Sequence, residues 1–225
     1  KEKVEFYESE TVEVDKALGR VLSKSIKAPI DLPPFRQSAM DGYALNISAD
    51  LSYKVLGEVK AGDNKNYFLT PGSCIRVFTG AFIPDSANTI VIQEKVKRNE
   101  NFIHLESFPK EKQNIREIGS QIKRGSISLE KGHKLNPAGL GLIQSLGIQY
   151  LDVYKKPLVT IIVTGNELIP PGGKLSKGKI FESNSLILKA GLEQNQIMPQ
   201  LVIEVLDSLG ATEDTLRKAL DSSNL

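Results

Sequence analysis

The spacing of apolar residues changes along the chain, and this change most constrains the fold. Between about residues 51 and 105 apolar and polar residues alternate, as in Leu51, Tyr53 and Val55. A period of two predicts short β-strands, and the turn sequences between them predict a small β-barrel or sandwich. From Leu158 onward a continuous apolar strand is followed by helix, strand and helix. That order predicts the start of an α/β domain.

Local signals place the other elements. Asn136-Pro137 combines a capping residue with a proline at the first helical position, which predicts the start of a helix that ends at Gly147. Asp15 is placed to cap a short helix. Paired prolines at positions 33 and 34 exclude helix from the segment around them. The expected helices are 16–22, 136–147, 185–193 and 212–220, and the expected strands of the α/β part are 158–163 and 200–205.

Composition excludes several classes of protein. With 40% hydrophobic and 25% charged residues, the chain is neither disordered nor a membrane bundle. Its net charge of +2 gives no basic field for nucleic acid. The apolar run 158–163 is far shorter than the ~20 residues that cross a bilayer. No leader pattern opens the sequence, so we expect a cytoplasmic protein. Because it begins with Lys1 and ends just after a helical pattern, we expect a piece of a longer protein.

The loop after the strand 158–163 is the most informative candidate site. Thr164 and Gly165 would let backbone approach an anionic group closely, and Glu167 could hold a metal ion or orient a nucleophile. Ligands bind beyond the carboxyl ends of strands in open α/β sheets, which supports this interpretation. Taken alone, a solvated turn is the commoner explanation. Asn184 precedes a predicted helix and is expected to cap it.

Two further motifs present polar side chains beside glycine. Asp41 precedes Gly42 after the proline-stiffened arm, which would hold a carboxylate on exposed backbone; Asp-Gly is also a common turn pair. Thr79 and Gly80 follow a predicted strand and could offer a hydroxyl and an N–H to an oxyanion, or simply enter a turn. Taken alone, each motif is more often an ordinary turn. The lone Cys74 and two scattered histidines predict neither a metal site nor a catalytic thiol.

The order of these motifs carries a family resemblance. They are Asp-Leu-Pro-Pro-Phe at 31–35, Ser-Ala-Met-Asp-Gly-Tyr-Ala at 38–44, Arg76 with Thr-Gly-Ala at 79–81, Ser-Leu-Gly-Ile at 145–148 and Thr-Gly-Asn-Glu-Leu at 164–168. Together they resemble the molybdopterin molybdenumtransferase (MoeA) family, which includes the gephyrin E-domain. The match runs from about Val12 to Leu192, and the motif at 38–44 is highly specific to the family.

The resemblance implies an activity and an assembly. Family members insert molybdate into adenylylated molybdopterin, release AMP, use Mg²⁺ and act as elongated homodimers with the active site between subunits. We therefore expect a transferase of molybdenum cofactor biosynthesis that binds a pterin nucleotide, with the molybdopterin adenylyltransferase as a possible partner. Because the family's later segments follow residue 225, we expect this fragment alone to be inactive.

The resemblance also implies a domain plan. Residues 1–42 and 114–155 would form a discontinuous linker and dimerisation domain. Residues 43–113 would form an inserted small β-barrel-like domain. Residues 156–225 would begin an α/β molybdopterin-binding domain that is truncated here. The expected fold class is therefore multidomain, α+β and α/β.

By the resemblance, Asp41, Thr79 and Glu167 match functional residues of the family, and Glu167 is the expected metal ligand. The chain departs from the family at Arg36-Gln37 and at Gln121, which stands where the family has a carboxylate. These departures favour an alternative, a non-catalytic molybdopterin-binding or scaffolding homologue. Adenylylation of molybdopterin itself belongs to a fold without the proline arm and ranks last. The expected substrate-binding residues are Ser38, Met40, Gly42, Gly80, Thr164, Gly165, Asn166, Ser183 and Asn184.

Overall fold

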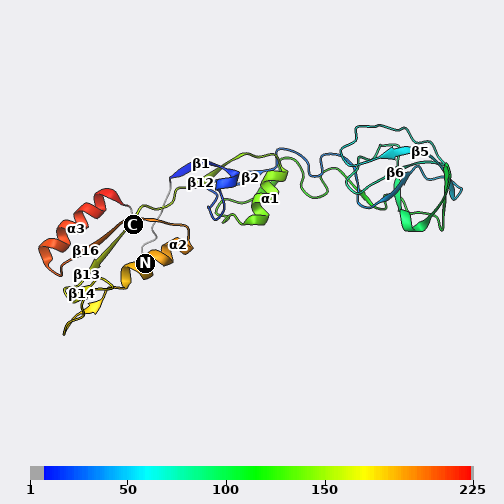
Figure 1. Cartoon of the computed structure of the whole chain (residues 1–225). Helices are drawn as coiled ribbons and strands as arrows, with labels where there is room; N and C mark the ends of the chain where they lie inside the picture. Colours follow the sequence, from blue (N-terminus) through cyan, green and yellow to red (C-terminus); the bar gives the residue numbers. More distant parts are fainter. Residues whose placement is uncertain (1–7, 224–225) are drawn as a thin grey trace. The chain divides into compact units, whose positions relative to one another are not determined.

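The computed structural model describes residues 8–223 as a mixed α+β protein that consists mostly of strands (Figure 1). Three α-helices occur among these residues. Contacts within the chain divide it into two compact units. The first unit is Lys1–Lys24 with Lys131–Leu225, and the second unit is Ser25–Glu130. Each unit is described separately below.

A curled six-stranded sheet forms most of the second unit. Its strands lie in the order β7-β4-β6-β5-β9-β8, and β5 and β6 are the one parallel pair. The alternation between residues 51 and 105 therefore predicted strands correctly, whereas closure of the sheet into a barrel stays a prediction. The strands are β4 Gly42–Leu45, β5 Ser52–Val59, β6 Ser73–Val77, β7 Thr89–Ile92, β8 Val96–Asn99 and β9 Phe102–Leu105.

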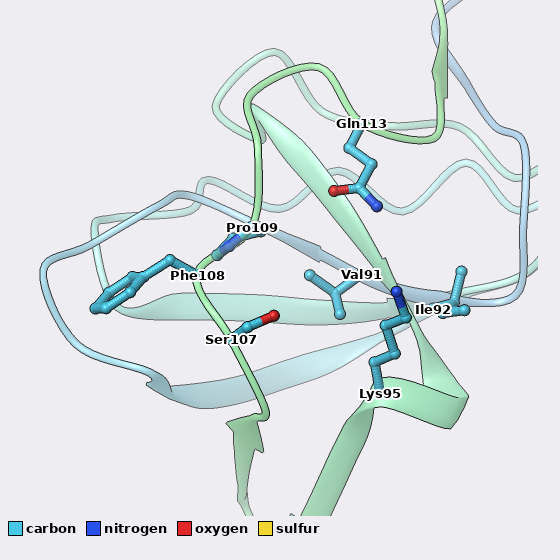
Figure 2. A pocket seen from close by; sticks show the side chains of 7 residues that line it. All are labelled: Val91, Ile92, Lys95, Ser107, Phe108, Pro109 and Gln113. Carbon is cyan, nitrogen blue, oxygen red and sulfur yellow. The ribbon is translucent and has the colours of Figure 1, made fainter.

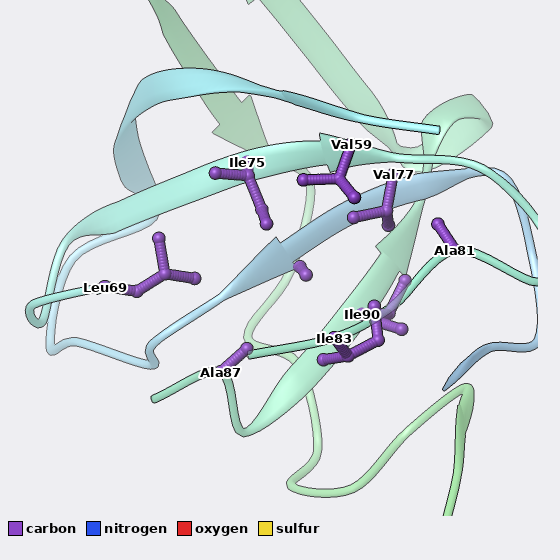
Figure 3. Close-up of a cluster of buried hydrophobic side chains, with 9 residues drawn as sticks. Val59, Leu69, Ile75, Val77, Ala81, Ile83, Ala87 and Ile90 are labelled. Atoms are coloured by element: carbon purple, nitrogen blue, oxygen red, sulfur yellow. The ribbon is translucent and has the colours of Figure 1, made fainter. Parts of the chain in front are cut away.

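Strand β4 is buried on both faces of this sheet. Ala44 belongs to a cluster of buried aliphatic side chains with Val77 and Ile90, most of which Figure 3 labels. Tyr43 and Leu45, which alternate with Ala44, belong to a second buried cluster. Because neither face of β4 is free to move, the residue just before this strand is held on a rigid support.

Gly42 begins β4 and is not part of a free turn. A Cβ at this position would lie 2.2 Å from the carbonyl oxygen of Val91 on the neighbouring strand β7. The Asp-Gly turn that the pair 41–42 alone favoured is therefore wrong, because Gly42 permits close strand packing.

Short strand pairs complete the second unit: β2 Ile26–Lys27 with β11 Ile127–Leu129, and β3 Gln37–Ser38 with β10 Ile115–Arg116.

In the first unit, β1 Ser9–Glu13 pairs antiparallel with β12 Tyr150–Tyr154. Helix α1 spans Pro137–Ser145, and Asn136 caps it by accepting a hydrogen bond from the Gly139 N–H at 2.8 Å, as predicted.

The expected helix over 16–22 is wrong. A single 3₁₀ turn, η1 Val14–Lys16, forms instead. Asp15 lies inside this turn, where it cannot act as the N-cap. The following residues leave helical geometry, because Gly19 has φ +74° and Leu22 forms a β-bridge with Val153.

The remainder of the first unit contains the predicted strand and helix order. Strand β13 Val159–Thr164 pairs in parallel with β16 Pro199–Val205. Burial of β13 differs from the prediction of a strand buried on both faces, because Val159, Ile161 and Val163 are buried while Ile162 on the other face is half-buried.

The other elements are η2 Gln93–Lys95 in the second unit and, in the first unit, β14 Leu168–Ile169, β15 Ile180–Phe181, α2 Asn184–Gln194 and α3 Leu209–Ser222. Within residues 8–223, every helix is too short or too polar to cross a membrane.

Candidate functional site

Asp41 and Thr79 lie 38 residues apart in the sequence and are joined by two hydrogen bonds. The Thr79 backbone N–H donates to Asp41 Oδ1 at 2.8 Å, and the Thr79 hydroxyl donates to the same oxygen at 2.9 Å. The second carboxylate oxygen, Oδ2, has no hydrogen-bond donor among the described residues. The pair therefore presents an oriented carboxylate with one free acceptor.

Strand pairing brings the two residues together. Asp41 immediately precedes β4, and Thr79 follows β6 by two residues. The two strands are antiparallel neighbours, with Gly42 opposite Val77, so the start of one lies beside the end of the other. Gly80 then turns the chain with φ +83°, and its N–H donates to the Ser38 carbonyl at 2.8 Å. Two motifs that sequence alone left as separate turns thus form one site.

Donors around the Asp41 carboxyl stabilise its ionised form. The Thr79 N–H, then the Thr79 hydroxyl, lower the pKa of Asp41 below its ordinary value, and the Arg76 charge lowers it further. Some burial acts in the opposite direction. The Asp41 side chain is therefore a carboxylate at neutral pH, available to accept a proton or a hydrogen bond.

Arg76 is fixed beside this carboxylate and was not among the predicted site residues. Its Nη1 donates to the Gly42 carbonyl at 2.9 Å, and its Nη2 donates to the Gln93 side chain. Its guanidinium lies 5.2 Å from the Tyr43 ring centroid and 4.9 Å from the Phe78 ring centroid. Such cation–π contacts hold the charge in place. The sequence signal was a basic residue on the strand that leads to Thr79.

The other predicted residues of the 38–44 motif differ in their surroundings. Ser38 is fully buried, its hydroxyl donates to the Met40 carbonyl, and its N–H donates to the Ala81 carbonyl at 3.0 Å. Met40 is exposed. Ser38 therefore shapes the loop that carries Asp41, while Met40 offers an apolar surface beside it.

The predicted loop after β13 lies in the first unit. Asn166 joins it to the end of β16, because its side-chain oxygen accepts a hydrogen bond from the Asp207 N–H at 3.1 Å. Gly165 has φ +156°, a conformation that residues with a side chain rarely adopt, and a Cβ here would lie 2.9 Å from both carboxylate oxygens of Glu167. The space that we expected an anionic ligand to approach is thus bordered by the Glu167 carboxylate itself.

A cavity of about 320 Å³ adjoins this loop. Thr164, at the end of β13, and Asn184, at the start of α2, supply polar groups to its lining. The structure therefore brings Thr164 and Asn184 to one cavity. The other lining residues are Ile162, Val163, Ile187 and Leu188.

The cap of helix α2 differs from the prediction. Ser183 occupies the N-cap position without a side-chain bond, and Asn184 is already helical. The buried Glu182 acts instead, accepting hydrogen bonds from the hydroxyl and the N–H of Ser185. These bonds, the hydroxyl first, lower the pKa of Glu182. An acidic residue three positions before Ser185 was the signal that sequence analysis missed.

The described residues contain no group of three or more His, Cys, Asp or Glu side chains that could hold a metal ion. Glu167 alone therefore cannot make a complete protein cage. Mg²⁺ is commonly bound through one or two carboxylates together with substrate phosphates and water. The Glu167 carboxylate fits that kind of site. Cys74 is buried, and burial raises the pKa of its thiol to about 12, so the side chain is a neutral thiol at neutral pH.

Figure 2 shows another small cavity of the second unit, with a volume of about 50 Å³. The side chains of Lys95 and Gln113 point toward each other, while the Phe108 ring is turned away. The volume suits one or two water molecules. It is too small for a nucleotide, so this cavity is not a candidate substrate site.

Residues 1–147 match a family model described as the MoeA N-terminal region (domain I and II). The chain belongs to the MoeA family. The resemblance predicted from the motifs is thereby confirmed. Among curated proteins, the MoeA-family chain is 36% identical over 211 residues to a molybdopterin molybdenumtransferase of Haemophilus influenzae, covering 92% of this chain and 50% of that protein. It is also 36% identical over 207 residues to gephyrin of Dictyostelium discoideum, covering 83% and 29% respectively.

A solved relative has the same fold. The molybdopterin biosynthesis moeA protein of Pyrococcus horikoshii OT3 matches with a TM-score of 0.87 and 35% identity, over 96% of this chain and 60% of that chain. This MoeA-family chain spans about half the length of the molybdopterin molybdenumtransferases that it matches from Haemophilus influenzae and Nostoc.

Proposed function

We propose that the protein acts in molybdenum cofactor biosynthesis as a molybdopterin molybdenumtransferase, which inserts molybdate into adenylylated molybdopterin and releases AMP. The observation that carries this proposal is the hydrogen-bonded pair of Asp41 and Thr79. Family membership supports it, because relatives that match more than nine-tenths of this chain bear that enzyme name.

In this mechanism the Asp41–Thr79 pair positions molybdate or the oxygen that attacks. Asp41 Oδ2 accepts a hydrogen bond from a protonated oxygen, while Oδ1 stays bound to Thr79. The fixed Arg76 charge beside the pair favours an oxyanion there. Positioning of this kind lowers the barrier because the reacting atoms are held in place before the bond changes.

The loop after β13 would bind the phosphates of the pterin nucleotide. Thr164 ends a parallel strand, and Gly165 and Asn166 follow its carboxyl end, where anionic ligands commonly bind. The Glu167 carboxylate would repel phosphate, which is a physical reason for a cation at this position. Glu167 would supply one oxygen ligand to Mg²⁺, which polarises a phosphoanhydride when bound. Asn184, with Ser183 before it, would complete the pocket.

The assembly is part of the same proposal. We infer a cytoplasmic homodimer that takes adenylylated molybdopterin, with the molybdopterin adenylyltransferase as a partner. The proposed domains remain 1–42 with 114–155, the insertion 43–113, and an α/β domain that begins at residue 156.

AMP release from adenylylated molybdopterin tests the proposal. Full-length gene product, molybdate and Mg²⁺ should yield AMP, and omission of molybdate should suppress it. Asp41→Asn keeps the size of the side chain but removes its charge, so we expect AMP release to fall at least about 100-fold, the lower end of the range for one positioned acid–base group. Asp50→Asn, at an exposed position of the same unit, is the matched control. Wild-type protein that releases no AMP would overturn the proposal.

The second candidate is a non-catalytic homologue that binds molybdopterin or protein partners as a scaffold. Gln121, an exposed amide where the family has a carboxylate, favours it. Arg36 does not, because its guanidinium donates to the carbonyls of Pro84 at 3.1 Å and Ala87 at 2.9 Å and so has a structural role. Tight pterin binding without AMP release would select this candidate.

A further inference from the structure

A cavity of about 500 Å³ in the second unit has no part in the mechanism above. Two aromatic rings, Phe35 and Phe82, form its apolar side, and a polar loop forms the rest. The ring centroids are 6.0 Å apart, and the ring planes meet at 62°. The lining residues are Phe35, Gly62, Asp63, Asn64, Asn66 and Phe82.

The backbone connects this cavity to the Asp41–Thr79 pair. The Ser38 N–H donates to the Ala81 carbonyl at 3.0 Å, and the Ile83 N–H donates to the Arg36 carbonyl at 2.9 Å. Phe35 therefore immediately precedes the paired segment 36–38, and this segment leads on to Asp41. Phe82 lies three residues after Thr79 on the partner segment.

The polar loop also reaches the catalytic segment. A Cβ on Gly80 would lie 3.9 Å from the Ala61 Cβ, so the loop that begins there passes close to Gly80, the residue after Thr79. Asn64 and Asn66 are exposed, and within residues 8–223 their side-chain amides make no hydrogen bond to the protein. They line the cavity with donors and acceptors that a ligand could satisfy.

Asp63 gives this lining a negative charge. Its Oδ2 accepts a hydrogen bond from the Lys60 N–H at 3.1 Å and lies 3.7 Å from the Lys65 ammonium. Its Oδ1 has no partner among the described residues. A carboxylate on the edge of an aromatic cavity suits a flat ring that presents N–H donors along one edge.

We propose that this cavity binds the pterin ring of the substrate, a deeper statement that rests on the proposed function. The pyrimidine edge of a pterin carries two adjacent N–H donors, from the 2-amino group and the ring nitrogen beside it. Such a fork matches a carboxylate such as Asp63 in the way that a guanidinium does. The ring face contacts Phe82 and Phe35. Adenine lacks two adjacent donors, so this cavity selects the pterin end of the nucleotide.

Equilibrium binding of two probes to the full-length gene product tests the proposal. The probes are 6-hydroxymethylpterin, followed by its own fluorescence, and AMP, followed by calorimetry. Phe82→Ala and Asp63→Asn should each weaken pterin binding about tenfold, the size expected for one stacked ring or one charge-assisted pair, and leave AMP binding unchanged. Phe102→Ala removes an exposed ring from β9 and should change neither.

The readouts separate this proposal from the proposed function. Circular dichroism identifies any variant that fails to fold, and Asp63→Asn changes no side-chain size. Wild-type affinity for the pterin in both folded variants would overturn the cavity assignment even if the wild type releases AMP. Variants that bind AMP more weakly but keep wild-type affinity for the pterin would overturn it as well. If the wild type releases no AMP but Phe82→Ala and Asp63→Asn weaken pterin binding, the result would support the cavity assignment and refute the transferase reaction.

Discussion

Thr79 supplies both hydrogen bonds that the Asp41 carboxylate accepts, and both lower the pKa of that carboxyl. Thr79 donates one bond from its backbone N–H and one from its side-chain hydroxyl. A substitution at position 79 affects these two donors differently. A substitution removes the hydroxyl but leaves the N–H, since the N–H belongs to the main chain. The pKa of Asp41 therefore depends partly on where the fold places the backbone of residue 79 and partly on the residue type at that position.

Thr79→Val should raise the pKa of Asp41 but leave it below its ordinary value of 3.8, because the larger contribution, the backbone N–H, remains. The depressed pKa stabilises the folded state at pH values above 3.8, and that stabilisation is lost as the pH falls through the folded-state value. Thr79→Val should reduce this dependence. A titration of the Asp41 carboxyl by NMR measures it. Thr79→Ser, which retains the hydroxyl, should titrate like the wild type.

Gly42→Ala tests the close packing of β4 on β7. The added Cβ would lie 2.2 Å from the Val91 carbonyl oxygen, so the backbone must move. We expect a loss of about 1–3 kcal/mol in the free energy of unfolding, measured with urea. Gly141→Ala is the matched control, because nothing lies within 4 Å of its Cβ and α1 should gain about 0.5–1 kcal/mol. Equal effects of the two changes would contradict the packing argument.

At the scale of elements, the start of α2 depends on a residue that precedes the helix. The Glu182 carboxylate occupies the N-terminal end, where unpaired N–H groups and the helix dipole favour an anion. Asn184, which we expected to cap the helix, contributes a side chain to the cavity instead. The cap and the proposed phosphate site are therefore made by different residues.

Glu182→Ala should consequently lower the melting temperature of the protein, while Asn184→Ala should leave it nearly unchanged. The first change leaves N–H groups of α2 without their acceptor, whereas the second removes no cap. Thermal unfolding followed by circular dichroism compares the two. Because hydrogen bonds from Ser185 lower the pKa of Glu182, the difference should shrink as the pH falls and Glu182 becomes protonated.

At the scale of the whole molecule, the two units have separate cores. Ile90 lies in the aliphatic cluster of the second unit, and Ile143 is fully buried in the first unit. The chain passes between the units near residues 24 and 130, so the second unit is inserted between two parts of the first. Separate cores imply that each unit can lose its structure without the other.

Hydrogen exchange tests this independence. Ile90→Ala should destabilise the second unit by about 2–5 kcal/mol and speed amide exchange in β4, β6 and β7 while α1 stays protected. Ile143→Ala should do the reverse. If either change accelerates exchange equally in both units, the units unfold as one and the division by cores is wrong.

The sequence predicted most elements whose signals are local. The cap at Asn136 and the alternation through β5 and β9 depend on neighbouring residues, and the structure contains them. The helix expected over 16–22 failed because Leu22 pairs with Val153, far along the chain. A distant strand partner can override a local preference for helix, and no local pattern shows that partner.

Family motifs in the sequence by themselves determined which family this chain belongs to and which carboxylates to suspect. Only the tertiary structure decided that Asp41 and Thr79 share one oxygen, that Arg76 stands beside them, and that Glu182 caps α2. The physical reason is that hydrogen bonds and Coulomb forces act over a few ångströms of space. Strand pairing, not separation along the chain, sets which groups come that close.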